Sequence, residues 1–480
     1  MPFKGLRDFV HLLERQRELR RVTGADWKLE MGALTELMWD AGGPALLFEN
    51  IKDYPKTFRL ATNLFATRKR CLLAMDLPLD LTEAEAIQAF EKKMADYRPV
   101  SPRTVSSGPI TENVLRGDRV DLHKIPAPLW HESDGGKYIG TGCCVIQREP
   151  HGGWVNVGTY RVMVHDQQTA GIFISEQHQG FAIEKKYWEK GLSCPVAISL
   201  GPEPGLFLAS SGGFGFAWGV SEYDVAGYLN GGPVEVMVEE YTGLPIPAHS
   251  EAVLVGEIPP PATEMRLEGP FGEFTGYYAS GTRPEPVIRV KAIYHRHEPI
   301  LLGSPPLMPK GPWGYSFALP VKKRGLKQKL LAQGIADVLD DCTVSIPGVA
   351  VIKIHQRDAE QAARVGSAAV RMTSARIVII VEEDIDIRDP GQVLWAVGTR
   401  CDPESGVEVI PDCPTHSLDP GLPPEKRKKG KLTTAKLVLN GCRPYRWMKD
   451  FPPVNRCSRE LRARTLERWR HLFQDMEVKA

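Results

Sequence analysis

The sequence predicts a mixed fold in which N-terminal and C-terminal α/β domains flank a central domain built mainly from β-strands. Helix and strand patterns alternate near the start of the chain. Short strands separated by Gly or Pro turns follow between residues 138 and 301, and strand–helix alternation returns after Pro320. A chain of 480 residues is long enough for two or three domains with hydrophobic cores of their own.

The first domain combines helices with strands. Apolar residues recur at helical spacing over residues 5–20, which predicts an amphipathic opening helix. Strands are predicted at residues 45–48 and 58–61. A second helix is predicted over residues 82–97, with Thr82 as its N-cap at the start of a capping box. The order of these elements indicates an α/β domain.

The central domain is expected after a connecting segment rich in Pro, Gly and Ser at residues 98–135. Short strands with Gly or Pro turns predict a β-barrel or a β-sandwich with a few inserted helices. The expected strands are residues 142–147, 154–164, 195–200, 234–238, 252–257 and 287–295.

The last third of the chain again alternates strands and helices, which predicts a second α/β domain. A charged helix at residues 458–475 ends the chain, and it would pack either on its own domain or on a neighbouring subunit. The other expected elements are helices at residues 321–339, 359–372 and 390–398 and strands at residues 349–355 and 377–382.

Composition excludes several classes of function. The net charge of +1 gives no sign of nucleic-acid binding, and the basic run at residues 426–429 is expected to be a solvated loop. No apolar stretch is long enough for a membrane span, and the N-terminus lacks a signal-peptide core. Nine cysteines without a Cys-x-x-Cys pair favour free thiols in the cytoplasm and argue against structural zinc.

Two glutamates give the strongest local sign of chemistry. Glu268 and Glu273 lie five residues apart around a Gly-Pro-Phe-Gly turn that can aim both carboxylates into one space. Carboxylates that share a site tend to keep one proton near neutral pH, as a general acid must. Taken alone, the pair is more often an exposed polar turn, because Glu-Gly-Pro turns are common on protein surfaces.

Other polar residues become informative only in combination. Alternation along the predicted strand 154–164 places Asn156 and Tyr160 on one face and Arg161 on the other, unless the strand bends. If Asn156, His178 and Glu222 converge, they offer two oxygens and one nitrogen to a hard divalent cation. Each of them is otherwise an ordinary loop or helix-end residue. The glycine-rich segment 210–215 lacks the ending of a P-loop.

Taken together, these motifs resemble the UbiD-type decarboxylases, and the resemblance covers nearly the whole chain. Members of this family use prenylated FMN to remove or add carboxylate on aromatic and α,β-unsaturated acids. The resemblance implies an N-terminal α/β domain at residues 1–120, a split β-barrel that binds FMN at 121–318, and a C-terminal α/β domain with a terminal helix at 319–480. The matching segments are residues 42–48, 219–227, 268–278, 384–386 and 393–401.

The resemblance also implies roles for individual residues. Arg161, Glu268 and Glu273 match the family's catalytic network, in which Glu273 would donate the proton that replaces CO₂. Arg161 would pair with Glu268 and with the substrate carboxylate. Glu268 would also stabilise the cationic form of the cofactor.

A second set of residues would hold the cofactor. Asn156, His178 and Glu222 match the ligands of Mn²⁺ or another divalent cation that bridges to the cofactor phosphate. K⁺ is possible near Trp154 and the 210–215 loop. The family's Asp-Ala-Thr after the phosphate-binding lysine is replaced here by Asn440-Gly441-Cys442. The cofactor-binding residues implied are Thr159, Tyr160, Arg161, Gln177, His178 and Lys436.

The function implied is reversible, non-oxidative decarboxylation through a covalent adduct with prenylated FMN. A flavin prenyltransferase would supply the cofactor, and the chain would form a homodimer or a homohexamer. The pocket, which Phe274 and residues 305–315 would shape, leaves the acid undefined. Two alternatives are a non-catalytic subunit of a multi-subunit carboxylase and an ordinary FMN oxidoreductase. The first is disfavoured because all the catalytic positions are present, and the second leaves the paired glutamates without a task.

Overall fold

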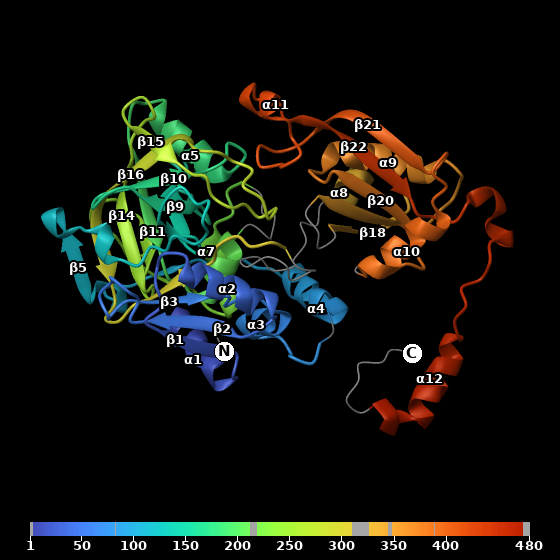
Figure 1. Ribbon diagram of the computed structural model, residues 1–480, viewed down its shortest axis with the longest axis horizontal. Helices are drawn as coiled ribbons and strands as arrows, with labels where there is room; N and C mark the ends of the chain where they lie inside the picture. Colours follow the sequence, from blue (N-terminus) through green and yellow to red (C-terminus); the bar gives the residue numbers. More distant parts are fainter. Residues whose placement is uncertain are drawn as a thin grey trace.

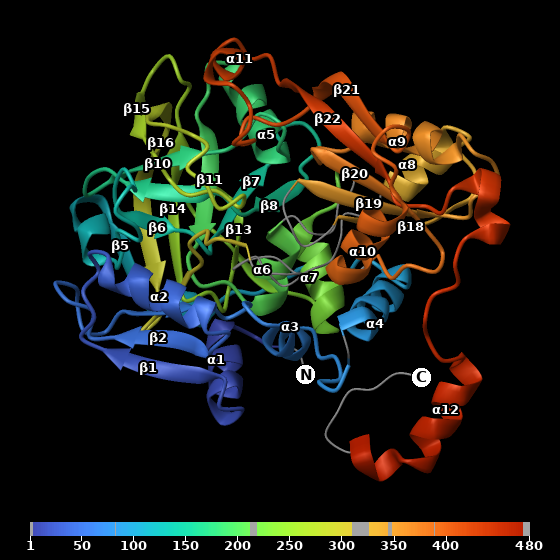
Figure 2. The ribbon, with the colours of Figure 1, turned by 45° about the vertical axis from the view of Figure 1, so that its right-hand side comes forward.

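The computed structural model describes residues 3–81, 83–211, 218–309, 326–343, 348–387 and 389–473. It divides into an N-terminal, a central and a C-terminal part (Figure 1). A second view shows the N-terminal part below the central sheet and the C-terminal part beside it (Figure 2). The predicted mixture of α/β and β architecture is confirmed.

The N-terminal part is a small sheet covered by helices, and its strand order is β1-β2-β3-β17. The last of these strands, β17 (Ile300–Gly303), comes from far along the chain and pairs in parallel with β3. The first helix buries one apolar face, as predicted, but it ends earlier than expected because Arg17 turns the chain into β1. The remaining elements are α1 (Leu6–Arg15), β1 (Leu19–Thr23), α2 (Glu30–Asp40), β2 (Ala45–Glu49), β3 (Arg59–Thr62), α3 (Arg68–Ala74) and α4 (Glu83–Ala95).

The central part is one large, curled sheet with the order β6-β9-β10-β16-β14-β11-β7-β8, and β5 and β15 also pair with the long strand β16. Every strand pair in this sheet is antiparallel. Its strands are β5 (Asn113–Arg116), β6 (Tyr138–Gly140), β7 (Cys144–Arg148), β8 (Val155–Gly158), β9 (Arg161–Val164), β10 (Thr169–Phe173), β11 (Cys194–Ser199), β14 (Ala252–Ile258), β15 (Met265–Glu268) and β16 (Arg283–His295).

Helices and short elements border this sheet. A minor sheet runs β13-β12-β4, with β12 parallel to β4. The helices are α5 (Gln179–Trp188), α6 (Pro204–Ser210) and α7 (Glu222–Asn230). The minor strands are β4 (Arg103–Thr104), β12 (Glu235–Val238) and β13 (Pro245–Pro247), and single-turn helices occupy Pro109–Thr111, Gly117–Arg119 and Leu122–Lys124.

One predicted strand of the central part is wrong in a way that matters for the site. The run 154–164 is not continuous, because β8 ends at Gly158 and β9 begins at Arg161. The turn between them folds the Tyr160 ring back over Gly158, where an added Cβ would lie 2.5 Å from the phenol oxygen. A side chain at position 158 would therefore collide with Tyr160. Because β8 and β9 are separate strands, alternation along one continuous strand does not define the direction of the Arg161 side chain.

The C-terminal part is a second α/β unit with the strand order β18-β19-β20-β22-β21. The predicted helix at 321–339 is only partly correct. Residues 321–325 lie outside the described residues, α8 ends at Ala332, and Gly334 turns the chain into β18. The elements are α8 (Leu326–Ala332), β18 (Val338–Thr343), β19 (Val349–Ile354), α9 (Gln361–Met372), β20 (Ile377–Glu382), α10 (Pro390–Arg400), β21 (Val407–Pro414), α11 (Pro424–Lys428), β22 (Thr433–Asn440), a 3₁₀ segment at Tyr445–Asp450, α12 (Arg459–Arg468) and a 3₁₀ turn at Arg470–Phe473.

The basic run at residues 426–429 is not a free loop, which corrects the expectation from sequence. It forms most of α11, and Arg427 donates hydrogen bonds to the carbonyl oxygens of Ala279 in the central part and of Asp419. The C-terminal part is thereby tied to the loop that follows Glu273.

The terminal helix α12 lies apart from the C-terminal sheet in both views (Figures 1 and 2). Its Leu461 and the following Trp469 and Leu472 are exposed by 41%, 42% and 58%. Within the described ranges, no helix combines the length and apolar character needed to cross a membrane. A cytoplasmic location, which the cysteine usage favours, stays a prediction.

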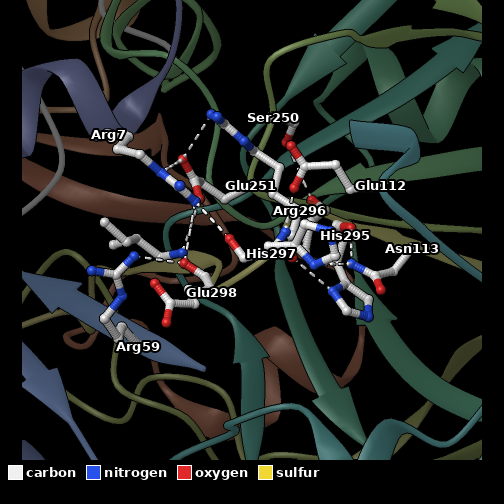
Figure 3. A network of polar contacts seen from close by, with 12 residues as sticks. Arg7, Arg59, Glu112, Asn113, Ser250, Glu251, His295, Arg296, His297 and Glu298 are labelled. Carbon is white, nitrogen blue, oxygen red and sulfur yellow. Dashed lines mark hydrogen bonds and ion pairs between the residues drawn. The ribbon is translucent and has the colours of Figure 1, made fainter. Parts of the chain in front are cut away.

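A buried carboxylate fastens the N-terminal helix to the central sheet (Figure 3). Glu251 is fully buried, and its Oε2 accepts hydrogen bonds from Arg7 Nη2 of α1 at 2.7 Å and from the backbone N–H of Ile300 at 3.1 Å. Its Oε1 accepts hydrogen bonds from Arg7 Nε at 3.2 Å and Arg296 Nη1 at 3.4 Å. Three segments distant in sequence therefore meet at one side chain.

Replacing Glu251 tests this junction. Glu251→Ala leaves two partly buried guanidinium groups without their carboxylate, and we expect the free energy of unfolding to fall by about 2–4 kcal/mol. Denaturant unfolding followed by tryptophan fluorescence measures the change. Glu14→Ala is the control, because the pair of Glu14 with Arg21 is solvent-exposed and should contribute less than about 1 kcal/mol. Equal effects of the two substitutions would contradict a structural role of Glu251.

Candidate functional site

A buried arginine lies between two glutamates where β9 meets the loop from β15 to β16. Arg161, the first residue of β9, donates from Nε to Oε1 of Glu268 at 2.8 Å and from Nη2 to Oε2 of the same residue at 2.7 Å. Its Nη1 donates to Oε1 of Glu273. The two carboxylates expected to share a space therefore do so, with one guanidinium between them. The alternative of an exposed polar turn is excluded, since Glu268 is fully buried and Glu273 is 8% exposed.

The local fold explains how the two carboxylates converge. Glu268 ends β15, where it lies opposite Arg283 of β16. Gly269 then adopts a left-handed φ of +81°, a conformation that glycine accepts without steric cost, and the chain turns back. An isolated bridge between Phe271 and Ser280 closes the loop around Glu273. The glycine turn noted in the sequence thus bends the backbone as expected.

The environment gives the two carboxylates different character. Glu268 receives a bidentate contact from Arg161, the arrangement that best stabilises a carboxylate anion. Burial raises the pKa of Glu273, and its contacts with Arg161 and Ser280 only partly offset this effect. Burial disfavours the charged form of Arg161 as well, but its contacts with Glu268 and Glu273 outweigh burial and raise the pKa of Arg161. Glu273 is therefore the carboxyl better suited to carry a proton.

Two hydroxyl groups complete the network, and neither was identified from the sequence. The Tyr138 hydroxyl donates to Oε1 of Glu268 at 2.9 Å, and the Ser280 hydroxyl donates to Oε1 of Glu273 at 2.9 Å. The Phe173 ring lies 4.5 Å from the guanidinium carbon of Arg161. Spacing could not reveal Tyr138 or Phe173, which lie on other strands. Ser280 follows Glu273 by seven residues in the same loop, but serine is common in loops.

A second group of polar side chains lies around Tyr160. The residues are Asn156 on β8, His178 at the N-cap of α5 and Glu222 at the start of α7. The rings of Tyr160 and His178 make an edge contact with centroids 5.6 Å apart, and Glu222 accepts a hydrogen bond from the backbone N–H of Val157 at 2.7 Å. Burial raises the pKa of Tyr160, and both Glu222 and Asn156 act on it. His178 thus contacts the Tyr160 ring, and Asn156 and Glu222 lie close enough to affect the pKa of Tyr160.

The chemistry of this group fits a hard divalent cation. Burial raises the pKa of Glu222 to about 7, so its carboxylate would gain from a neighbouring positive charge. The side-chain nitrogen of Asn156 is buried and makes no hydrogen bond within the described part of the chain. An amide oxygen, an imidazole nitrogen and a carboxylate suit such a cation. Among the described residues, no group of three His, Cys, Asp or Glu residues could hold a metal ion. The ligand set of Asn156, His178 and Glu222 stays a prediction.

The neighbouring loop is described only at its edges. Residues 212–217 of the glycine-rich segment lie outside the described residues. At its start, the hydroxyl groups of Ser210 and Thr159 lie 3.1 Å apart, and at its end the rings of Trp218 and Trp154 lie 4.8 Å apart. Thr159 and Trp154, two of the residues assigned by resemblance, therefore border this loop.

The remaining predicted residues lie in three different settings. Gln177 is exposed beside His178, and the ring of Phe274 lies 5.6 Å from that of His416 in the C-terminal part. Lys436 is 2% exposed on β22, and its ammonium donates hydrogen bonds to the carbonyl oxygens of Val370, at 2.9 Å, and Thr373. These carbonyl groups lie at the C-terminal end of α9, where a cation is favourable. In this structure the ammonium of Lys436 is therefore bonded to a helix end, and its role at the cofactor phosphate stays a prediction.

The structure combines a curled β-sheet between two α/β parts with a buried arginine that binds two glutamates. Comparison with known proteins identifies its family. Models of the N-terminal, Rift-related and C-terminal domains of 3-octaprenyl-4-hydroxybenzoate carboxy-lyase match residues 10–90, 103–309 and 329–441. The chain belongs to this UbiD family, and the prediction of a carboxy-lyase is confirmed.

Similar proteins cover nearly the whole chain. Pyrrole-2-carboxylic acid decarboxylase from Pseudomonas aeruginosa is 33% identical over 96% of this chain and 97% of its own length. Vanillic acid decarboxylase from Sedimentibacter hydroxybenzoicus, in a closed form, has a TM-score of 0.81 at 27% identity, over 98% and 99% of the two chains. An evolved dimeric form of HmfF from Pelotomaculum thermopropionicum, in complex with prFMN, has a TM-score of 0.73 at 27% identity, over 95% and 97%.

Substitution of Lys436 distinguishes its two roles. We expect Lys436→Met to lower the free energy of unfolding by about 1–3 kcal/mol, because the carbonyl groups at the end of α9 lose their donor. Flavin content after purification should not change. Lys431→Met, at an exposed position, serves as the control. Loss of flavin with unchanged stability would instead support the phosphate-binding role that the resemblance implies.

Proposed function

We propose that this protein catalyses the reversible, non-oxidative decarboxylation of an aromatic, heteroaromatic or α,β-unsaturated carboxylic acid with prenylated FMN as cofactor. The observation that carries the proposal is the buried network in which Arg161 joins Glu268 and Glu273. The decarboxylases of pyrrole-2-carboxylic and vanillic acids among the similar proteins support an aromatic substrate. The HmfF complex with prFMN supports the cofactor.

The residues of this chain divide the proton chemistry between them. When bound, prenylated FMN supplies an electron sink for the electron pair released as the C–CO₂ bond breaks. The carbon that loses CO₂ must then gain one proton, and Glu273 donates it, because burial raises the pKa of this carboxyl. In the reverse direction, the Glu273 carboxylate accepts that proton.

Arg161 and Glu268 set the charge of the site. Oxygen atoms of both glutamates take up three of the five N–H groups of Arg161, and Ser280 accepts from Nη1 as well. The guanidinium is thereby held in one plane, in which it can also attract the carboxylate of an incoming acid. Glu268, bound to the guanidinium by two hydrogen bonds, would stabilise positive charge on the cofactor.

The same proposal assigns the group around Tyr160 to the cofactor phosphate. Asn156, His178 and Glu222 would hold Mn²⁺ or a similar cation, and Thr159 and Gln177 would lie nearby, with K⁺ possible beside Trp154. The curled central sheet would serve as the split barrel that binds the flavin. A flavin prenyltransferase would supply the cofactor. Leu461 of α12 and the following Trp469 and Leu472 are exposed and would be covered in a homodimer or homohexamer.

Identification of the bound cofactor tests the function directly. The chain is produced together with a flavin prenyltransferase and purified without oxygen, and the released flavin is measured by absorbance and mass. Prenylated FMN, together with CO₂ release from aromatic acids such as pyrrole-2-carboxylate or vanillate, is the expected result. Plain FMN that oxidises NAD(P)H would favour an oxidoreductase. Absence of any flavin would favour a non-catalytic subunit.

Removal of the proton donor should stop the reaction without releasing the cofactor. We expect Glu273→Gln to lower kcat at least about 100-fold with an unchanged flavin content, because the amide occupies the same space but cannot donate a proton to carbon. CO₂ release per bound flavin measures the effect. Glu240→Gln, at an exposed glutamate, is the control and should keep full activity. Normal turnover by Glu273→Gln would remove Glu273 as the donor.

Loss of the carboxylate at the start of α7 should affect metal and flavin together. Glu222→Ala removes one proposed ligand, and we expect both manganese and flavin to fall below half of the wild-type occupancy. Elemental analysis and flavin absorbance measure them on the same sample. Asp224→Ala takes a carboxylate from the same first turn of α7 and controls for helix stability. Unchanged occupancy of both groups in Glu222→Ala would refute the metal bridge.

A further inference from the structure

Ser280 lies between the guanidinium and the proton-carrying carboxyl. It accepts a hydrogen bond from Arg161 Nη1 at 3.2 Å and donates one to Oε1 of Glu273 at 2.9 Å. It is 2% exposed, so water does not compete for either contact. Both hydrogen-bonding functions of the hydroxyl are therefore used inside the network.

The backbone around Ser280 is held from two sides. Ser280 forms the isolated antiparallel bridge with Phe271, across the loop that carries Glu273. The carbonyl oxygen of the preceding residue, Ala279, accepts a hydrogen bond from Arg427 of α11 in the C-terminal part. The hydroxyl thus projects from a fixed point, which is what a positioning group requires.

The two oxygens of Glu273 differ as a result. Oε1 accepts hydrogen bonds from Arg161 and Ser280, whereas Oε2 accepts none from any residue that the structure describes. An oxygen that already accepts two hydrogen bonds is the poorer site for a proton. A protonated Glu273 then carries its proton on Oε2, the oxygen left for a substrate.

We propose that Ser280 is a positioning residue that holds Oε1 of Glu273 inside the network and thereby presents Oε2 as the proton-donating atom. The inference rests on the proposed function, because it concerns the direction in which Glu273 delivers its proton. It adds a residue outside the Arg161–Glu268–Glu273 set. Without Ser280, the carboxyl keeps a single contact with Arg161 and can rotate, so either oxygen can face the reacting carbon.

Neighbouring charged and polar groups set the pKa of Glu273. Arg161 on β9 lowers its pKa, Glu268 on β15 raises it, and the Ser280 hydrogen bond lowers it against the dominant effect of burial. From the C-terminal part, His416 approaches the neighbouring Phe274. Loss of Ser280 removes a donor that favours the anion, so the pKa of Glu273 should rise. A general acid works only while protonated, and activity should then persist to higher pH.

The test compares Ser280→Ala with Ser280→Thr, which keeps the hydroxyl. For Ser280→Ala loaded with flavin, we expect kcat to fall about 10- to 100-fold with little change in KM, because a misplaced donor mainly affects the chemical step. We also expect the alkaline limb of the kcat profile to move up by about one pH unit. Ser280→Thr should recover most of kcat and the original profile.

A matched control removes an equivalent hydrogen bond elsewhere. The Ser367 hydroxyl on α9 of the C-terminal part donates to Glu408 at 2.8 Å on the surface. Ser367→Ala therefore makes the same chemical change outside the Arg161 network. It should leave kcat and the profile unchanged. Unfolding transitions and flavin content of all variants separate a loss of folding from a loss of positioning.

An infrared titration tests the inference without turnover. The carboxylic acid band that disappears in Glu273→Gln reports the protonation of Glu273 in the flavin-free protein. In Ser280→Ala this band should persist to higher pH than in the wild type. An unchanged band together with wild-type kcat and profile would overturn the role of Ser280. If the wild-type protein releases no CO₂ from any acid, but the band in Ser280→Ala persists to higher pH as expected, only the proposed function would be contradicted.

Discussion

The site depends on one interaction, the contact of the Arg161 guanidinium with two buried carboxylates. Two glutamates this close cannot both be anions in a dry environment unless a cation lies between them. Arg161 meets this need unequally, since it binds Glu268 with two parallel hydrogen bonds and Glu273 with one. This inequality gives Glu268 the stronger contact with the guanidinium, and burial raises the pKa of Glu273.

The same interaction explains features of the fold that would otherwise be unrelated. A guanidinium at the first residue of β9 can reach the β15–β16 loop only because β9, β10, β16 and β15 are neighbours in one curled sheet. The loop must turn back sharply after Glu268, which the left-handed Gly269 allows. The C-terminal part then contacts this loop through Arg427. The loop that carries Glu273, the proposed proton donor, is thus held by residues from two parts of the chain.

Sequence reasoning identified the glutamate pair from its spacing and Arg161 from family resemblance, but it could not supply their geometry. Strict alternation could not define the direction of Arg161, because the chain turns where Tyr160 folds over Gly158 and β9 is a separate strand. Ser280 and Tyr138 were missed, since their roles arise from tertiary contacts. The fourth strand of the N-terminal sheet, β17, was missed for the same reason. The sequence also could not show that the Lys436 ammonium donates to carbonyl groups at the end of α9, and its role at the cofactor phosphate stays a prediction.

The break at residues 159–160 also explains how two chemically different sites share one short segment. Asn156 lies on β8 before the turn and Arg161 on β9 after it, so the two side chains leave the backbone in different directions. On one side, Tyr160 packs against His178 and comes under the influence of Glu222, and on the other Arg161 binds the two glutamates. A cofactor whose phosphate occupied the first site would extend from it toward the second. If both proposed roles are correct, a single turn of the backbone would set the spacing between the phosphate site and the Arg161 network, and precise placement is what proton transfer to carbon requires.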